Sequence, residues 1–194
     1  MTRYSSPITD EEIQQLPRKE FDGEIFLIDT LEKLDQAMAM LQGEDLLGFD
    51  TETRPSFKKG KMNEVSLLQL SNADQAFLFR LNYIGLPHSL RKLLEDASVL
   101  KIGLALRDDL KALRRLGEFE PHGFIDLQDI AQENDVPHNG LKKLAAMFLK
   151  YRISKARSKR LSNWEAEHLG PKQVRYAATD AWICFKLYQV MKKL

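Results

Sequence analysis

Short apolar segments alternate with amphipathic segments along most of the chain, and this alternation is the strongest constraint on its fold. The short runs predict strands, and the longer segments between them carry apolar residues at helical spacing. We expect strands at residues 24–28, 45–51, 64–70, 75–80, 98–103 and 123–126, and helices near 30–42, 88–95 and 105–116, with mainly helix thereafter. This order predicts an α/β fold, with a central mixed sheet of five to six strands flanked by helices.

The length of 194 residues, with 43% hydrophobic content, suits one domain with a sizeable core. We expect residues 24–194 to form that domain. Residues 1–23 are expected to form an N-terminal extension with a short helix, because Thr9-Asp10-Glu11-Glu12 matches a capping box. The chain shows no repeat, low-complexity tract or linker-like segment that would indicate another boundary.

Charge and cysteine content limit the classes of protein to consider. There are 29 basic and 28 acidic residues, so any contact with nucleic acid must come from local charge. The single cysteine, Cys184, lies in an apolar helical stretch and is expected to be a buried thiol. The N-terminus does not resemble a signal peptide, and no apolar stretch has membrane-spanning length. We therefore expect a soluble protein in the cytoplasm.

Two carboxylates, Asp50 and Glu52, lie at the end of the apolar segment 45–51, with Glu52 just beyond it. Side chains two residues apart on a strand point to the same face, so the two anions share one small volume. Like charges about 4 Å apart repel by several kcal/mol at an intermediate dielectric. A hard divalent cation would neutralise them. The pair alone also fits a solvated strand end, so the metal interpretation depends on further carboxylates.

Further carboxylates follow in two helical segments. Asp108 and Asp109 lie just after the strand expected at 98–103, at the start of a helix. There they could simply be acids favoured by the helix dipole. Tyr176 and Asp180 lie four residues apart on one face of a helix that is expected to begin at Pro171. Neighbouring small residues would let that helix approach the sheet closely, although a surface tyrosine near an aspartate is also common.

These segments, in this order, resemble the three exonuclease motifs of the DEDD superfamily, in the tyrosine (DEDDy) subclass. The similarity covers roughly residues 24–192. It includes Val65-Ser66-Leu67-Leu68-Gln69-Leu70 and Leu161-Ser162-Asn163-Trp164-Glu165. The exonuclease domain of the Werner syndrome helicase and ribonuclease D are the nearest relatives by this resemblance. A histidine variant of the site has His five residues before the last Asp, where this chain has Arg175.

The resemblance implies a ribonuclease H-like fold and a site that holds two divalent cations, Mg²⁺ or Mn²⁺, with Asp50, Glu52, Asp109 and Asp180. It implies that Asp50 bridges both ions, that Glu52 and Asp180 complete the site of one, and that Asp109 acts on the other. Asp109 is preferred to Asp108 on the spacing from Gly103. Tyr176 would orient the attacking water, because a phenol with a pKa near 10 is a poor base at neutral pH.

Substrate contacts are predicted from charge and position. Residues 140–160 contain eight basic and no acidic residues, which suits a phosphate backbone but also a solvated helix face. Phe57, shortly after the first motif, is a candidate for stacking on a terminal base, or for packing within the hairpin. The candidate substrate-binding residues are Thr51, Phe57, Lys155 and Arg160.

The function predicted from the sequence is a metal-dependent 3′-5′ exonuclease. It would hydrolyse phosphodiester bonds of DNA or RNA by a two-metal-ion mechanism and release nucleoside 5′-monophosphates. The alternative is a non-catalytic nucleic-acid-binding module that retains the fold. Such a module would be expected to have lost at least one of the five site residues, and all five are present.

Overall fold

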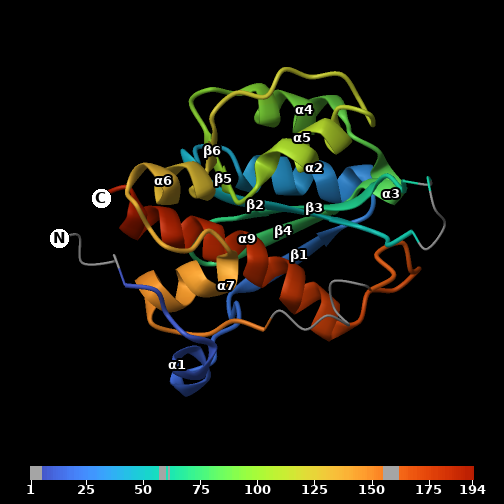
Figure 1. Ribbon diagram of the computed structural model, residues 1–194. Helices are drawn as coiled ribbons and strands as arrows, with labels where there is room; N and C mark the ends of the chain where they lie inside the picture. Colours follow the sequence, from blue (N-terminus) through green and yellow to red (C-terminus); the bar gives the residue numbers. More distant parts are fainter. Residues whose placement is uncertain (1–5, 57–59, 61, 155–161) are drawn as a thin grey trace.

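The computed structural model describes residues 6–56, 60, 62–154 and 162–194, and these residues contain one mixed sheet (Figure 1). Its strand order is β1-β4-β3-β2-β5-β6. Within this sheet only β3 runs antiparallel to its neighbours. The strands are β1 (Glu24–Ile28), β2 (Leu46–Thr53), β3 (Val65–Ser71), β4 (Gln75–Arg80), β5 (Leu100–Gly103) and β6 (Phe124–Asp126).

Helices cover both faces of the sheet (Figure 1). The helices α2, α4 and α5 lie over one face, and α9 crosses the other face beside α7. The helices are α1 (Asp10–Gln15), α2 (Leu31–Met40), α3 (Leu81–Ile84), α4 (His88–Glu95), α5 (Leu106–Leu113), α6 (Leu127–Glu133), α7 (Leu141–Leu144) and α9 (Pro171–Met191), and a π-helical segment, η1 (Ala145–Leu149), continues α7.

The core has a layer on each side of the sheet. Every residue of β3 is buried, because the helices cover both of its faces. Phe49 and Phe77 pack with α2 and α4 in one layer. Leu67 and Leu78 pack with the N-terminal half of α9 in the other layer. Burial of each large apolar side chain stabilises the fold by about 1.5–3 kcal/mol, so the sheet and α9 form a firm support for side chains at the ends of the strands.

The predicted α/β fold is confirmed, with six strands in the sheet. The strand expected at 24–28 and the helix expected at 88–95 have those bounds. The short helix α3 was not predicted, because its four residues are too few to show helical periodicity. The capping box at Thr9 and Glu12 is present, and Cys184 is buried as expected. Among the described residues, no helix combines the length and hydropathy that crossing a bilayer requires.

Candidate active site

Asp50 and Glu52 lie on β2, at the end of its pairing with β3. Asp50 is opposite Gln69 in the ladder, and the register shifts just after Glu52. The alternation of a strand directs both carboxylates to the same face, toward α9. Glu52 is buried and Asp50 is half-buried. The strand therefore fixes two anionic groups side by side, as the sequence predicts.

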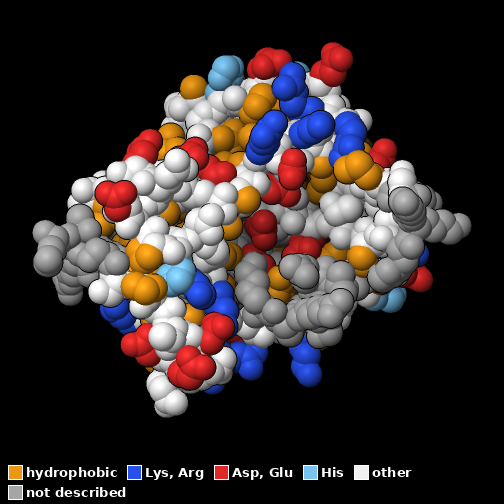
Figure 2. Space-filling view, in the orientation of Figure 1, with side chains coloured by type: hydrophobic (Ala, Val, Ile, Leu, Met, Phe, Trp, Pro, Cys, Tyr) orange, Lys and Arg blue, Asp and Glu red, His pale blue; other side chains and the backbone are white. Residues whose placement is uncertain are grey.

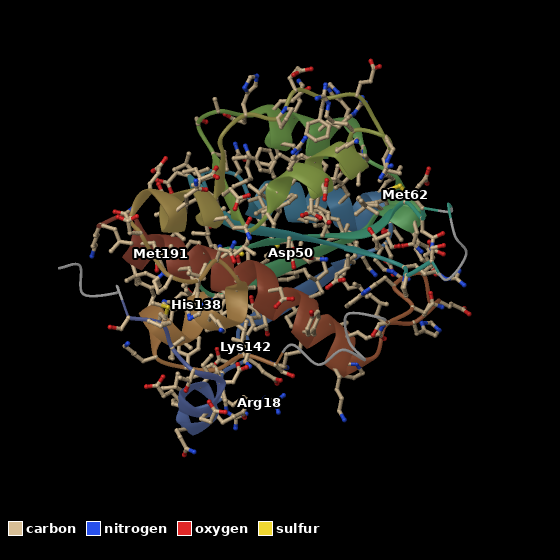
Figure 3. All side chains as sticks on the ribbon, viewed as in Figure 1. Arg18, Asp50, Met62, His138, Lys142 and Met191 are labelled. Atoms are coloured by element: carbon tan, nitrogen blue, oxygen red, sulfur yellow. The ribbon has the colours of Figure 1, made fainter. Side chains whose placement is uncertain are left out.

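Helix α9 brings a third carboxylate to this face. Asp180 is 1% exposed, and Tyr176 lies one helical turn before it and is also buried. Carboxylate oxygens of Asp50, Glu52 and Asp180 lie within 4.8 Å of one another. In Figure 3 Asp50 lies near the middle of the view, beside α9. We call these three residues the carboxylate cluster.

A glycine on β2 makes this close approach possible. A Cβ atom at Gly48 would lie 1.9 Å from the carbonyl oxygen of Ala181, which follows Asp180 on α9. The small side chains of Ala177, Ala178 and Ala181 are fully buried at the same interface. The absence of a side chain at Gly48 thus sets the distance between Asp180 and the two carboxylates of β2.

The donor set of the carboxylate cluster fits a hard divalent cation. Three carboxylates in one partly dehydrated volume repel one another, and a bound divalent cation would convert that repulsion into attraction. Oxygen ligands are those that such cations prefer. The cluster can therefore hold metal.

Asp109 reaches this region from α5, on the other side of β2. The hydroxyl of Thr51 donates a hydrogen bond to Oδ1 of Asp109 at 2.5 Å. Thr51 lies between Asp50 and Glu52, so its side chain points to the opposite face of the strand. Burial raises the pKa of Asp109, and the charges of Asp108 and Asp126 add to this effect, while the Thr51 hydrogen bond lowers the pKa. Asp109 thus lies on the other side of β2 from the carboxylate cluster and is not one of its three members.

The start of α5 is held by Asp126, at the end of β6. Its carboxylate accepts hydrogen bonds from the backbone N–H of Ala105 at 3.0 Å and of Leu106 at 2.8 Å. Ala105 has the left-handed conformation, with φ of 59°. Oδ1 also accepts the N–H of Gln128 at 2.9 Å and caps α6. Asp126 therefore determines where α5 begins and, through α5, where Asp109 lies.

The loop before α9 packs against Tyr176. The ring of Trp164 is fully buried, and its centroid lies 6.2 Å from that of Tyr176. Arg80, at the end of β4, is buried and donates to the carbonyl oxygens of Ala166 and Glu167. These contacts fix the loop and restrict the Tyr176 ring.

The structure brings Asp50, Glu52 and Asp180 together and puts Tyr176 beside Asp180 on α9. Asp109 faces Thr51, while Asp108 is exposed to solvent. The remaining candidates for substrate contact, Phe57, Lys155 and Arg160, lie outside the described residues.

Analysis of the sequence missed Asp126 and Arg80. Asp126 precedes an apolar helical segment, so its role as a cap of α6 could have been recognised. Its second role, toward Ala105 and Leu106, depends on the pairing of β5 with β6. Arg80 directly follows the apolar run Ala76-Phe77-Leu78-Phe79. A cation at the end of such a buried run could have indicated a buried arginine with a structural partner.

Relatives share sequence with most of the chain. Residues 25–194 match the family model described as 3′-5′ exonuclease. A 3′-5′ exonuclease of Arabidopsis thaliana is 28% identical over 97% of the chain and 70% of its own length. The bifunctional 3′-5′ exonuclease/ATP-dependent helicase WRN of mouse is 32% identical over 92% of the chain. The chain spans only 13% of that mouse protein.

Solved structures share the fold. The EXO domain of Aedes aegypti Nibbler superposes with a TM-score of 0.78 and 24% identity, over 87% of each chain. Trypanosoma brucei RNase D in complex with RNA U12 superposes with a TM-score of 0.77 and 23% identity, over 88% of this chain and 63% of its own. Brucella melitensis NrnC bound to pGG superposes with a TM-score of 0.67 and 23% identity, over 92% of this chain and 81% of its own. These similarities confirm the predicted ribonuclease H-like fold. From the match over residues 25–194 and the motifs that it contains, the chain belongs to the 3′-5′ exonuclease family of enzymes, as a DEDD-type member related to WRN.

Proposed function

We propose that the chain removes nucleotides from the 3′ end of DNA or RNA by hydrolysing phosphodiester bonds, with release of nucleoside 5′-monophosphates. The observation that carries this proposal is the carboxylate cluster, in which three acidic side chains from β2 and α9 have oxygens within 4.8 Å of one another. Membership of the 3′-5′ exonuclease family supports the direction of cleavage.

The proposed ligands of two divalent cations, Mg²⁺ or Mn²⁺, are Asp50, Glu52, Asp109 and Asp180. Two such ions, when bound, stabilise the charge that develops on the attacking and leaving oxygens of the phosphodiester. Four carboxylates carry four negative charges, which two dications balance before the substrate phosphate arrives. The hydrogen bond from Thr51 keeps one oxygen of Asp109 fixed toward β2.

Tyr176 is proposed to orient the attacking water with its hydroxyl, which assigns the chain to the tyrosine subclass. The contact with the buried Trp164 ring holds the phenol in place. Orientation rather than proton removal is the role that suits a phenol at neutral pH.

Nucleic acid is the proposed partner, with Thr51, Phe57, Lys155 and Arg160 retained as substrate-binding candidates. The solved complex of Trypanosoma brucei RNase D contains RNA U12, and NrnC was solved with pGG. We extend nucleic-acid binding to this chain by its family, and we retain the cytoplasmic location predicted from the sequence. Residues 24–194 are proposed as the catalytic domain and residues 1–23 as an extension.

The test is cleavage of 5′-labelled oligonucleotides. Single-stranded and recessed DNA and RNA would be incubated with the purified protein in Mg²⁺, Mn²⁺ or EDTA. We expect a ladder that shortens from the 3′ end, and no ladder in EDTA or with Asp50→Ala. Binding without shortening, in every metal, would contradict the proposal and favour a non-catalytic binding module.

A matched pair of variants on α5 tests the choice of acidic residue. Asp109→Asn should abolish most of the activity, because it removes a proposed ligand. Asp108→Asn changes the neighbouring exposed carboxylate in the same way and should retain activity. Equal loss in the two variants would argue against a specific role for Asp109.

A further inference from the structure

Helix α5 and its C-terminal end carry four basic residues that are exposed to solvent. They are Arg107, Lys111, Arg114 and Arg115. We call these residues the α5 basic stripe, since they recur every three to four residues and so share one side of the helix. Figure 2 shows basic side chains gathered over α5, above the hollow in which acidic side chains lie.

The helix that carries the stripe also carries Asp109, and in Figure 2 its basic side chains lie above the hollow with acidic side chains. Asp109 lies two residues from both Arg107 and Lys111, so it points to the other side of α5, where Thr51 of β2 donates a hydrogen bond to it. At the other end, Nη1 of Arg115 lies 3.8 Å from Sδ of Met62, in the connection that follows β2. Helix α5 is therefore bonded to β2 through Asp109, and Arg115 at the end of the stripe contacts the connection that follows β2.

The charges of the stripe remain largely uncompensated. Arg114 forms an ion pair with Glu120 at 3.2 Å, and both side chains are well exposed. Within residues 6–56, 60, 62–154 and 162–194, no carboxylate lies within 4.0 Å of the cationic groups of Arg107, Lys111 or Arg115. Three cations on the exposed side of α5 are thus available to an external anion.

Two basic residues of the tract at 140–160 have partners within the chain. Lys142 pairs with Asp10 at 2.9 Å, and Nε of Arg152 donates to the carbonyl oxygen of Leu16 at 3.1 Å. These two cations attach the segment around α1 to the domain. Of the three stripe members without an ion pair, Arg115 has the contact with Met62, and no internal hydrogen bond or ion pair is found for Arg107 or Lys111 among the described residues.

We propose that the α5 basic stripe binds phosphates of a polynucleotide several nucleotides away from the 3′ end that is being cleaved. This inference rests on the proposed function and adds a preference for long strands over dinucleotides. From Arg107 to Arg115 there are eight steps of about 1.5 Å each, so the stripe is about 12 Å long. One strand of a duplex rises about 3.4 Å per nucleotide, so the stripe matches about three to four phosphates. A dinucleotide held at the carboxylate cluster is too short to reach most of it.

The test removes the three unpaired charges together. The variant Arg107→Gln/Lys111→Gln/Arg115→Gln is compared with the control Lys19→Gln/Lys192→Gln/Lys193→Gln, in which three exposed lysines outside α5 are changed. The substrates are a 5′-phosphorylated dinucleotide, a single-stranded 12-mer and the same 12-mer in a recessed duplex. Cleavage is measured in Mn²⁺ over a range of salt, and binding of a fluorescent 12-mer is measured in EDTA.

We expect the stripe variant to lose at least tenfold in kcat/KM and in affinity on one or both 12-mers, and less than twofold on the dinucleotide. Its slope of log affinity against log salt should fall by about 3, or about 1 per lost phosphate contact. A larger loss on the single-stranded 12-mer would mean that the bound phosphates belong to the cleaved strand. A larger loss on the recessed duplex would mean that they belong to the paired strand. The control should keep the wild-type values.

Three results would overturn the inference. The 12-mers could be cleaved and bound as by wild type, the dinucleotide could lose as much as the 12-mers, or the control could lose as much as the stripe variant. Binding in EDTA is measured without cleavage, so failure of the proposed exonuclease activity is seen separately. Circular dichroism checks that both variants are folded.

Discussion

At the scale of single residues, the contact between Gly48 and α9 controls the geometry of the carboxylate cluster. A Cβ atom at Gly48 would lie 1.9 Å from the oxygen of Ala181 and 2.9 Å from the backbone nitrogen of Phe185. Both are backbone atoms of α9, so the whole helix would have to move away. The distance between Asp180 and β2 therefore depends on a residue that has no side chain.

Gly48→Ala should destabilise the protein by about 1–3 kcal/mol, as other overpacking substitutions do, and should weaken metal binding. The physical reason is that α9 must shift and carry Asp180 with it. Urea unfolding and titration with Mn²⁺ measure the two effects. Gly140→Ala is the control, because a Cβ there would have no atom within 4 Å. Wild-type metal affinity in a folded Gly48→Ala protein would disprove the argument.

Tyr176→Phe should lower the cleavage rate by about a hundredfold, as loss of positioning does, and leave substrate binding nearly unchanged. The variant keeps the ring that packs on Trp164 and removes only the hydroxyl. Rapid-quench kinetics gives the rate, and fluorescence anisotropy in EDTA gives the affinity. Tyr188→Phe makes the same change farther along α9 and should change neither the cleavage rate nor the affinity. An unchanged rate for Tyr176→Phe would remove its proposed role.

Single residues differ in how far the sequence predicts them. Asp50 and Glu52 could be paired from the two-residue period of a strand, and Tyr176 could be paired with Asp180 from the four-residue spacing of a helix. The hydrogen bond between Thr51 and Asp109 could not be predicted, since it depends on where α5 begins. That start requires the left-handed conformation of Ala105, which alanine adopts rarely and which no local pattern signals.

At the scale of elements, one carboxylate connects the starts of two helices. Asp126 accepts hydrogen bonds from the N–H groups of Ala105 and Leu106 at the start of α5. It also accepts one from an N–H group in the first turn of α6. Asp126→Ala should therefore lower stability by about 1–3 kcal/mol. For a chain of this size that corresponds to about 2–4 °C in Tm for each kcal/mol. Thermal unfolding measures the loss, and the exposed Asp129→Ala in the same helix should change Tm little. Equal shifts in the two variants would refute the capping role.

Strand β5 and helix α4 are joined by a buried lysine. Nζ of Lys101 donates to the carbonyl oxygens of Leu93 at 3.1 Å and Asp96 at 2.7 Å, at the C-terminal end of α4. Burial lowers the pKa of Lys101 to about 8, and the charge of Asp96 offsets part of this shift. The folded protein therefore loses this proton at a lower pH than the unfolded chain does.

The sign of the resulting pH dependence follows from linkage. Below pH 8 Lys101 is charged in the folded protein, and burial of this charge lowers the free energy of unfolding by about 3 kcal/mol. Between pH 8 and the ordinary value of 10.5, the unfolded chain binds more protons, so the free energy of unfolding rises with pH. Relative to Lys101→Met, the wild type should gain about 2 kcal/mol between pH 7 and pH 10. Urea unfolding at both values measures this, and a constant difference would contradict the depressed pKa of Lys101.

Elements with strong patterns were predicted well, and those set by packing were not. The apolar runs of β1, β3 and β4 and the helix that begins at Pro171 are clear in the sequence. The π-helical segment Ala145–Leu149 is not, because the extra residue in its turn is accommodated by packing of Met147 and Phe148 within the layer that includes α9. Tertiary contacts, rather than local propensity, decide such a segment.

At the scale of the whole molecule, the candidate site joins the two layers of the core. Asp109 comes from α5 on one face of the sheet, Asp180 comes from α9 on the other, and β2 lies between them. Mutual repulsion of the acidic side chains opposes this arrangement when no cation is bound. A bound cation should therefore stabilise the packing of α9 on the sheet as well as the site itself.

Saturating Mn²⁺ or Mg²⁺ should thus raise the Tm of the entire protein. A cation at about 100 times its Kd adds about 2.7 kcal/mol to the free energy of unfolding, or about 5–10 °C in Tm for a chain of this size.

Asp180→Asn removes one of the repelling anions, so without added cation it should unfold at or above the wild-type temperature. With cation it should gain little, because a ligand is missing. Asp108→Asn removes an exposed charge next to Asp109 and should keep the full gain. Differential scanning calorimetry with EDTA, Mg²⁺ or Mn²⁺ distinguishes these variants, and an equal gain in Asp180→Asn and wild type would mean that the cation binds outside the carboxylate cluster.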